Sequence, residues 1–184
     1  HWLAATGLIG RVCVAAAADA SASSAAARAD GAALVVGESE GLAYVKAVIP
    51  PGLTKHTLAK GIAHASPMIR HAALCLLLNV TKAVGARVAY LESAIREGDT
   101  KRRGRDHRSW RLDDLLAYAR LGASTMLPDV QSIMAAYTVS KGGKEKDAAA
   151  MVLMRCHALN AIAACVTIVP DALMDAKIDL NKLL

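Results

Sequence analysis

The clearest hydrophobic pattern in the chain lies between residues 66 and 97. Apolar residues recur there at spacings of three and four, close to the period of an α-helix, which predicts one long amphipathic helix. Ser66 and Pro67 suit its N-cap and first helical position, and Glu97-Gly98-Asp99 indicates its end. The residues expected to face the core are Ile69, Ala73, Leu76, Val80, Val84, Val88, Leu91 and Ile95.

Three further helices are predicted beyond this one. The first is capped by Ser109, the second opens at Leu127-Pro128-Asp129 and ends at Gly142-Gly143, and the third spans about residues 145–169, before Pro170. The first two are expected to bury Leu112, Leu115, Leu116, Ala119 and Ala123, and Val130, Ile133, Met134 and Tyr137. The third is expected to bury Ala149, Val152, Cys156, Leu159, Ala163 and Val166.

The first third of the chain gives weaker patterns. Residues 2–18 suit a buried helix, and residues 19–41 form a low-complexity connector rich in Ala and Ser. Residues 42–49 are apolar but too short to assign between strand and helix, and Pro50-Pro51-Gly52 ends them. Residues 53–63 predict a short helix whose inward residues are Leu53, Thr57, Leu58 and Ile62.

These patterns together predict an all-α fold. Each predicted helix has an apolar side, proline starts and glycine or charged stops separate the helices, and no segment alternates like a strand. This order is typical of antiparallel helix pairs stacked as in HEAT or armadillo arrays, although no repeat of fixed period can be aligned. We interpret residues 1–184 as a fragment of one α-solenoid domain, internal to a longer protein.

Composition agrees with a helical core and changes the functional picture little. Hydrophobic residues make up 54% of the chain and aromatic residues only 3%, so the core must be aliphatic and rich in alanine. Uninterrupted apolar runs fall short of the roughly 20 residues that span a bilayer, so we predict no membrane span and no membrane partner. The four cysteines form no C-x-x-C pair, which favours buried thiols in a reducing compartment.

The charge is concentrated in residues 98–108, predicted to be a basic loop between helices. The net charge of the chain is +6, and between residues 101 and 108 five basic residues less one Asp give +4. Such a segment can neutralise phosphates of RNA, act as a nuclear import signal, or be a solvated insertion with no partner. Trp110 is its one aromatic neighbour, so few side chains are present that could stack on bases. Contacts are therefore expected to the sugar-phosphate backbone of the RNA and not to its bases. The candidate RNA-binding residues are Lys101, Arg102, Arg103, Arg105 and Arg108.

No catalytic pattern is found in the sequence. A glycine-flanked serine, a loop Cys/His setting and clustered carboxylates are absent, and Lys141-Gly142-Gly143-Lys144 lacks the spacing of a phosphate-binding loop. We therefore predict neither an enzyme nor a cofactor.

Histidine and cysteine residues leave one alternative open. His71 and Cys75 are four residues apart on one predicted helix, while Cys156, His157 and Cys165 share another, so a shared metal site is geometrically conceivable. Structural zinc sites usually bring paired ligands at short spacings across a turn, which these residues lack. Packing of these side chains, with no bound metal, is the simpler interpretation.

Several short motifs resemble the N-terminal region of the nucleolar pre-ribosomal-associated protein 1 family. They are Leu53-Thr54-Lys55, residues 60–66, residues 69–74 with the long helix that follows, and Met126-Leu127-Pro128-Asp129-Val130-Gln131, which resembles the Leu-Pro-Asp element that follows a variable charged insertion in that family. The resemblance covers about half of the chain and rests on helix-packing motifs.

The resemblance implies a non-catalytic scaffold of the nucleolus that acts early in assembly of the large (60S) ribosomal subunit. Its implied partners are ribosome assembly factors, including an RNA helicase, and pre-rRNA. Two alternatives stay open: a HEAT-like protein adaptor in transport or trafficking, and an organellar RNA-associated protein, suggested by the Ala/Ser/Arg composition of residues 20–28.

Overall fold

The computed structural model describes residues 37–101, 107–139 and 148–174, with side chains over 37–97, 112–138 and 148–174. These ranges contain helices and no strand, which confirms the predicted all-α class. Residues 2–18 and most of the predicted connector lie outside the described residues. The elements are α2 (Glu38–Lys46), α3 (Lys55–Ile62), α4 (Pro67–Lys101), α5 (His107–Met126), α6 (Val130–Val139), α7 (Ala148–Ile168) and the short 3-10 helix η2 (Pro170–Leu173).

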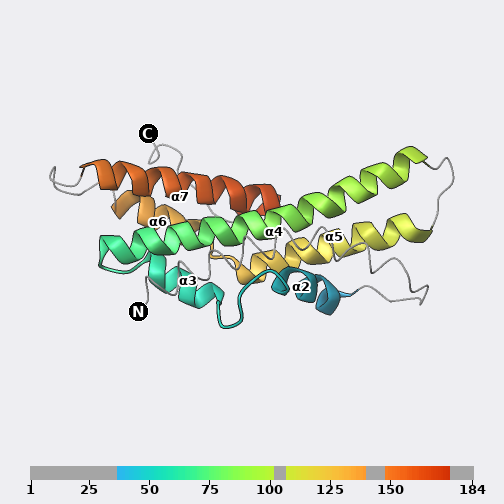
Figure 1. Ribbon diagram of the computed structural model, residues 1–184, viewed down its shortest axis with the longest axis horizontal. Helices are drawn as coiled ribbons and strands as arrows, with labels where there is room; N and C mark the ends of the chain where they lie inside the picture. The colour runs from blue at the N-terminus through green and yellow to red at the C-terminus, as the bar shows by residue number, and fades with distance from the viewer. Residues whose placement is uncertain (1–36, 102–106, 140–147, 175–184) are drawn as a thin grey trace.

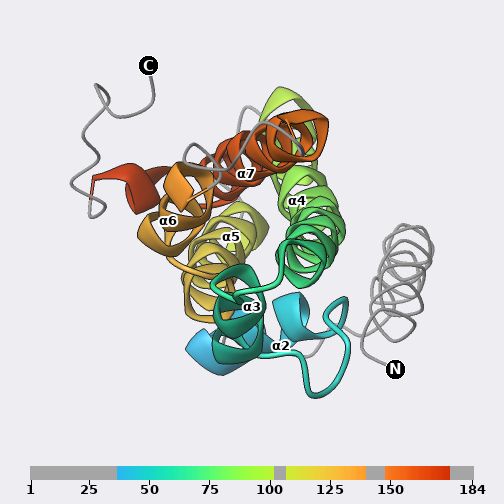
Figure 2. The same ribbon diagram turned by 90° about the vertical axis from the view of Figure 1, so that its left-hand side faces the viewer.

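The long helix α4 forms the axis of the described structure (Figure 1). Helix α5 returns antiparallel beside it, α7 packs along its other side, and α3 packs near its beginning. Helix α2 packs on α5, and α6 packs on α7 (Figure 2). The arrangement is a bundle in which α4 is covered on several sides.

The predicted core of α4 is largely confirmed. Six of the eight predicted positions are buried, while Ile69 and Ile95 near the two ends are half-buried. Leu74, Leu77 and Ala83 are buried as well, so the covered surface is wider than a single apolar side, because several helices surround α4. Pro67 is the first helical residue as predicted, but the helix continues past Gly98 to Lys101.

The predicted core of α7 is wrong. Val152 and Leu159, expected inside, are 55% and 42% exposed, and Cys156 is exposed too. The opposite side is buried instead, through Met154, Ala158, Ala161, Cys165 and Ile168. Both sides of this helix are apolar and Arg155 is its sole charged residue, so the spacing of apolar residues could not choose between them.

Two corrections concern the region before α4. Helix α2 begins at Glu38, inside the predicted connector, and the unassigned segment that follows is helical as far as Lys46. Thr57, expected in the core, is exposed because it forms the capping box of α3 with Thr54. Its backbone N–H donates to the Thr54 hydroxyl at 3.2 Å, which satisfies a free amide at the helix start.

Two further corrections concern helix starts. Helix α5 begins at His107, so Ser109 lies inside the helix and is not its N-cap. Helix α6 begins at Val130, so Pro128 precedes the helix and does not occupy its first turn. The predicted core residues of these two helices are buried or half-buried, which confirms their orientation.

Candidate functional site

The structure describes only part of the basic segment that is predicted to bind RNA. Lys101 is the last residue of α4 and Arg108 lies in the first turn of α5, so the predicted loop of residues 98–108 is shorter at both ends. Arg102, Arg103 and Arg105 lie outside the described residues, as do the side chains of all five basic candidates. Their role in RNA binding stays a prediction.

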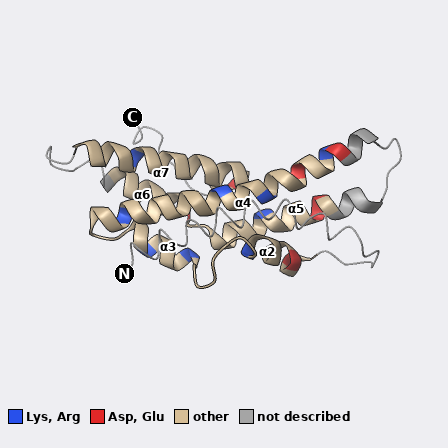
Figure 3. Ribbon diagram, in the orientation of Figure 1, with Lys and Arg blue, Asp and Glu red and all other residues tan. Residues whose placement is uncertain are grey.

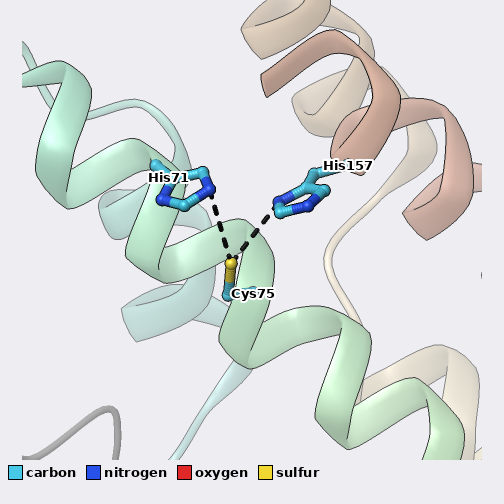
Figure 4. Close-up of side chains that lie close together, drawn as sticks. All are labelled: His71, Cys75 and His157. Carbon is cyan, nitrogen blue, oxygen red and sulfur yellow. Dashed lines mark hydrogen bonds between the residues drawn. The ribbon is translucent and has the colours of Figure 1, made fainter. Parts of the chain in front are cut away.

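Two histidines and one cysteine meet where α7 packs on α4 (Figure 4). His71 and Cys75 are one helical turn apart on α4, and such residues share a face. The Cys75 Sγ lies 3.7 Å from His71 Nε2 and 3.4 Å from Nδ1 of His157, which α7 supplies. The two imidazole rings stack with centroids 4.9 Å apart and an interplanar angle of 16°.

The surroundings of this cluster favour the neutral forms of Cys75 and His157. All three residues are half-buried, and burial raises the pKa of the Cys75 thiol. Burial also lowers the pKa of His157, and the neighbouring His71 lowers it further because two imidazolium charges would repel each other. A neutral imidazole keeps a lone pair, which a hydrogen-bond donor or a cation can use.

The structure brings together only three of the five histidine and cysteine residues considered in the sequence analysis. Cys156 is exposed on the far side of α7, and Cys165 is buried elsewhere, with a pKa raised by burial to about 12. His71 and Cys75 could be paired from their spacing alone. The choice of His157 depends on how α7 is rotated against α4, which no spacing in the sequence encodes.

The outward side of α7 is a second candidate site. Val152, Leu153 and Leu159 are 55%, 46% and 42% exposed, and we call these three residues the α7 outer face. Figure 3 shows that α7 is almost free of charged residues along its length. Exposed apolar groups gathered on one helix are typical of a surface that binds another apolar surface.

Two helices are long and apolar enough to cross a membrane by length and composition alone. They are Pro67–Glu97 in α4 and Ala148–Ile168 in α7, with mean hydropathy 1.5 and 1.6 over their most apolar windows. Half of the α4 window is buried within the bundle, as is typical of a core helix, but only 28% of the α7 window is buried. The sequence-based expectation of no membrane span rested on the length of uninterrupted apolar runs. Polar residues interrupt both helices and keep those runs short, although the average hydropathy of each helix is high.

A groove of about 650 Å³ opens where the end of α5, the start of α6 and the end of α7 meet. Its lining is mixed, with Leu121 and Val169 beside Arg120 and Asp171.

Comparison with known proteins adds no relative. No protein-family model, curated protein or solved structure matches this chain. The α7 outer face and the charge of the chain are therefore the observations that bear on its function.

Proposed function

We propose that this chain is a non-catalytic helical scaffold, part of a HEAT- or armadillo-like α-solenoid, that serves early assembly of the large ribosomal subunit in the nucleolus. The α7 outer face binds a further helical layer or an assembly factor, and the basic residues from the end of α4 to the start of α5 bind pre-rRNA phosphates. The nucleolar setting comes from the resemblance of the sequence motifs, and the binding role of α7 comes from its surface.

The observation that carries the scaffold role is that α7 is apolar on two opposite sides. One side is buried against α4 and α6, and the other side exposes Val152, Leu153 and Leu159. A helix that is apolar all round is normally enclosed by neighbours on both sides. In stacked helix arrays each unit covers the apolar side of the one before it, so an uncovered apolar side is where the next unit binds.

A protein partner suits the α7 outer face better than a bilayer does. Arg155 lies in α7, close to its middle, and its guanidinium carbon is 5.9 Å from the centre of the Tyr137 ring of α6. An arginine at the centre of a membrane costs about 2.5–3.5 kcal/mol or more, whereas a protein interface accommodates it beside an aromatic ring. His157 and Asn160 add further polar groups to the same helix.

The RNA-binding role depends on the density of positive charge between α4 and α5. Five Lys and Arg residues within eight positions can contact several phosphates of one strand. Contacts of this kind release condensed counterions, so the affinity falls steeply as salt rises.

The α7 outer face is tested in the full-length protein by the triple substitution Val152→Ser, Leu153→Ser and Leu159→Ser. Met68→Ser is the control, because Met68 is an apolar residue that is 67% exposed on a different helix, α4. We expect the triple variant to leave pre-60S particles on sucrose gradients while retaining its helical circular dichroism, and the control to stay bound. Equal sedimentation of both variants would contradict the proposal, as would binding of the wild type to phosphatidylcholine vesicles that the triple variant loses.

The basic residues are tested by replacing Lys101, Arg102, Arg103, Arg105 and Arg108 with Ser. We expect weaker binding to pre-rRNA and a flatter dependence of the affinity on salt, because fewer counterions are released. An unchanged salt dependence would reject a role for this segment in RNA binding.

The groove between α5, α6 and α7 favours a second candidate, a HEAT-like adaptor that binds a partner helix in transport or trafficking. Its mixed lining of leucine, valine, arginine and aspartate suits an amphipathic peptide. If this candidate is correct, partner proteins should still co-purify with the chain after ribonuclease treatment, and ribosomal particles should be absent from the purified material.

A further inference from the structure

The two distances from Cys75 Sγ to the histidine nitrogens match the sulfur-to-nitrogen distance of a tetrahedral metal site. Bonds of about 2.3 Å to sulfur and about 2.0–2.1 Å to nitrogen at a tetrahedral angle place the two ligand atoms about 3.6 Å apart. The observed Sγ to N distances are 3.7 Å for His71 and 3.4 Å for His157. All three ligand atoms lie within 4.8 Å of one another. Side-chain rotations that bring the two histidine nitrogens closer together would place all three atoms around one ion.

The chemistry of the three ligands selects the class of ion. One thiolate and two imidazoles are preferred by Zn²⁺ and related thiophilic cations, whereas Ca²⁺ and Mg²⁺ require oxygen ligands. This cluster contains no carboxylate, and it is the one group of three or more metal-ligating residues found among the residues that the structure describes. The half-buried positions of its members leave a path for an ion to enter.

A network of hydrogen bonds is the competing explanation for the same contacts. The Cys75 thiol has one hydrogen, which can be donated to one histidine, and the other histidine must then donate its N–H to the sulfur. Sulfur is a weak partner in both roles. The neutral cluster thus gains little from the convergence of two ring nitrogens on one sulfur, whereas a cation uses the lone pairs of all three.

We propose that His71, Cys75 and His157 bind one Zn²⁺ ion that ties α7 to α4, with the fourth coordination position open to water or to a group of a partner. The Cys75 thiol gives its proton to solvent and its sulfur forms the bond to the metal. The three ligands come from two helices that are far apart in sequence, so the ion acts as a cross-link within the bundle. This site is independent of the proposed scaffold role and differs from the sequence-based preference for packing without metal.

The site is tested on the purified chain with Co²⁺ as a spectroscopic probe and Zn²⁺ as its competitor. We expect the visible absorption of tetrahedral Co²⁺ together with a thiolate-to-cobalt charge-transfer band, and loss of both when Zn²⁺ is added. We also expect one Zn²⁺ per chain in isothermal titration calorimetry and a thermal midpoint that rises with Zn²⁺ concentration, because the folded state binds the ion.

Substitutions at the three ligands should separate the site from other cysteines and histidines. We expect Cys75→Ser to abolish the charge-transfer band, and His71→Gln or His157→Gln to weaken Zn²⁺ binding at least about tenfold. Cys156→Ser is the matched control, because Cys156 is adjacent to His157 in the chain but lies on the exposed side of α7. This control should keep the band, the affinity and the thermal shift.

Several outcomes would overturn the proposal. They are a charge-transfer band that persists in Cys75→Ser, an affinity that Cys156→Ser lowers as much as Cys75→Ser does, and the absence of any band in the folded wild type. Dimerisation on adding Zn²⁺, seen by size-exclusion chromatography, would show that the ion links two chains and would refute the cross-link between α4 and α7. Circular dichroism of each variant establishes that the helices remain formed.

Discussion

Gly41 of α2 lies directly against the backbone of Tyr118 of α5, so that a Cβ atom at position 41 would come within 2.7 Å of the Tyr118 carbonyl oxygen. The approach is mutual, since a Cβ atom on Gly122 of α5 would lie 3.0 Å from the Cα of Leu42. The two helices therefore cross with their backbones nearly in contact. Only a residue without a side chain fits at position 41.

Gly41→Ala is expected to lower the free energy of unfolding by about 1–3 kcal/mol, because the added methyl group forces α2 away from α5. Gly85→Ala is the control within α4, where the nearest atom to an added Cβ belongs to Ile168 at 3.7 Å, an ordinary contact distance. This second substitution should raise stability by about 0.5–1 kcal/mol, since alanine loses less backbone entropy in a helix. Urea unfolding monitored by circular dichroism measures both, and an equal effect of the two substitutions would show that α2 does not pack on α5 in this way.

The two sides of α7 should respond differently to truncation. Met154→Ala is expected to cost about 2–5 kcal/mol, because Met154 is 2% exposed and its loss leaves a cavity. Leu159→Ala should change the free energy of unfolding by no more than about 0.5 kcal/mol, because Leu159 is exposed. Denaturant unfolding of the isolated chain distinguishes them. A large loss of unfolding free energy in Leu159→Ala and a small one in Met154→Ala would show that α7 has the orientation predicted from the spacing of its apolar residues.

The sequence was sufficient for the helices from α3 onward, but not for α2 or for every helix orientation. In α4 the polar residues are placed so that one apolar side stands out, and the predicted positions from Ala73 to Leu91 are buried. In α7 the whole circumference is apolar, so burial is decided by which neighbours are present. Helix starts were also misplaced at Ser109 and Pro128, because a capping residue is only one of several ways to begin a helix.

The candidate site was predictable only in part. The one-turn spacing of His71 and Cys75 is visible in the chain, and their shared face follows from helix geometry. The third member, His157, is 82 residues away from Cys75, and its place depends on the packing of α7 against α4. Cys156, the neighbour of His157 in sequence, points away for the same reason.

Thiol reactivity should follow the burial of the described cysteines. Among the described cysteines, Cys156 is exposed and is expected to react first with 5,5′-dithiobis(2-nitrobenzoic acid). Cys165 is buried with a strongly raised pKa and should react only after unfolding. The measurement is mass spectrometry of tryptic peptides after timed labelling of the native chain. Cys156→Ser is the control that should remove the early label from the peptide containing residue 156. Early labelling of Cys165 would contradict the packing of α7 described above.

Burial of Cys165 should also make stability depend on alkaline pH. Its pKa is about 12 in the folded chain against 9.0 for an unperturbed thiol, so the folded state keeps a proton that the unfolded state loses above pH 9.0. The stabilisation is complete below pH 9.0 and is lost as pH rises toward about 12, at a rate of up to about 1.4 kcal/mol per pH unit.

Cys165→Ala removes this dependence and leaves a small cavity whose cost does not vary with pH. The difference in unfolding free energy between wild type and variant should therefore shrink above pH 9.0. Urea unfolding at a series of pH values measures it. A difference that stays constant through this range would show that the Cys165 thiol is not held protonated by burial.

Tyr44 of α2 and Arg87 of α4 contact each other in three ways. The Tyr44 hydroxyl donates to the Arg87 carbonyl oxygen at 3.3 Å, Nη1 of Arg87 donates to the Tyr44 carbonyl oxygen at 3.3 Å, and the guanidinium carbon lies 4.7 Å from the ring centre. Both residues are half-buried, and burial raises the pKa of the Tyr44 hydroxyl. The pair joins α2 directly to the central helix.

A double-mutant cycle with Tyr44→Ala and Arg87→Ala should give a coupling energy of about 1 kcal/mol, from a partly desolvated cation–π contact. The control cycle uses the ion pair of Lys55 and Asp129, 2.6 Å apart with side chains 38% and 67% exposed, for which about 0.2–1 kcal/mol is expected. In about 1 M NaCl the Lys55–Asp129 coupling should nearly vanish, because salt screens exposed charges, while the Tyr44–Arg87 coupling should persist. If salt lowers the Tyr44–Arg87 coupling energy as much as the Lys55–Asp129 coupling energy, the guanidinium of Arg87 is solvated and does not stabilise the packing of α2 on α4.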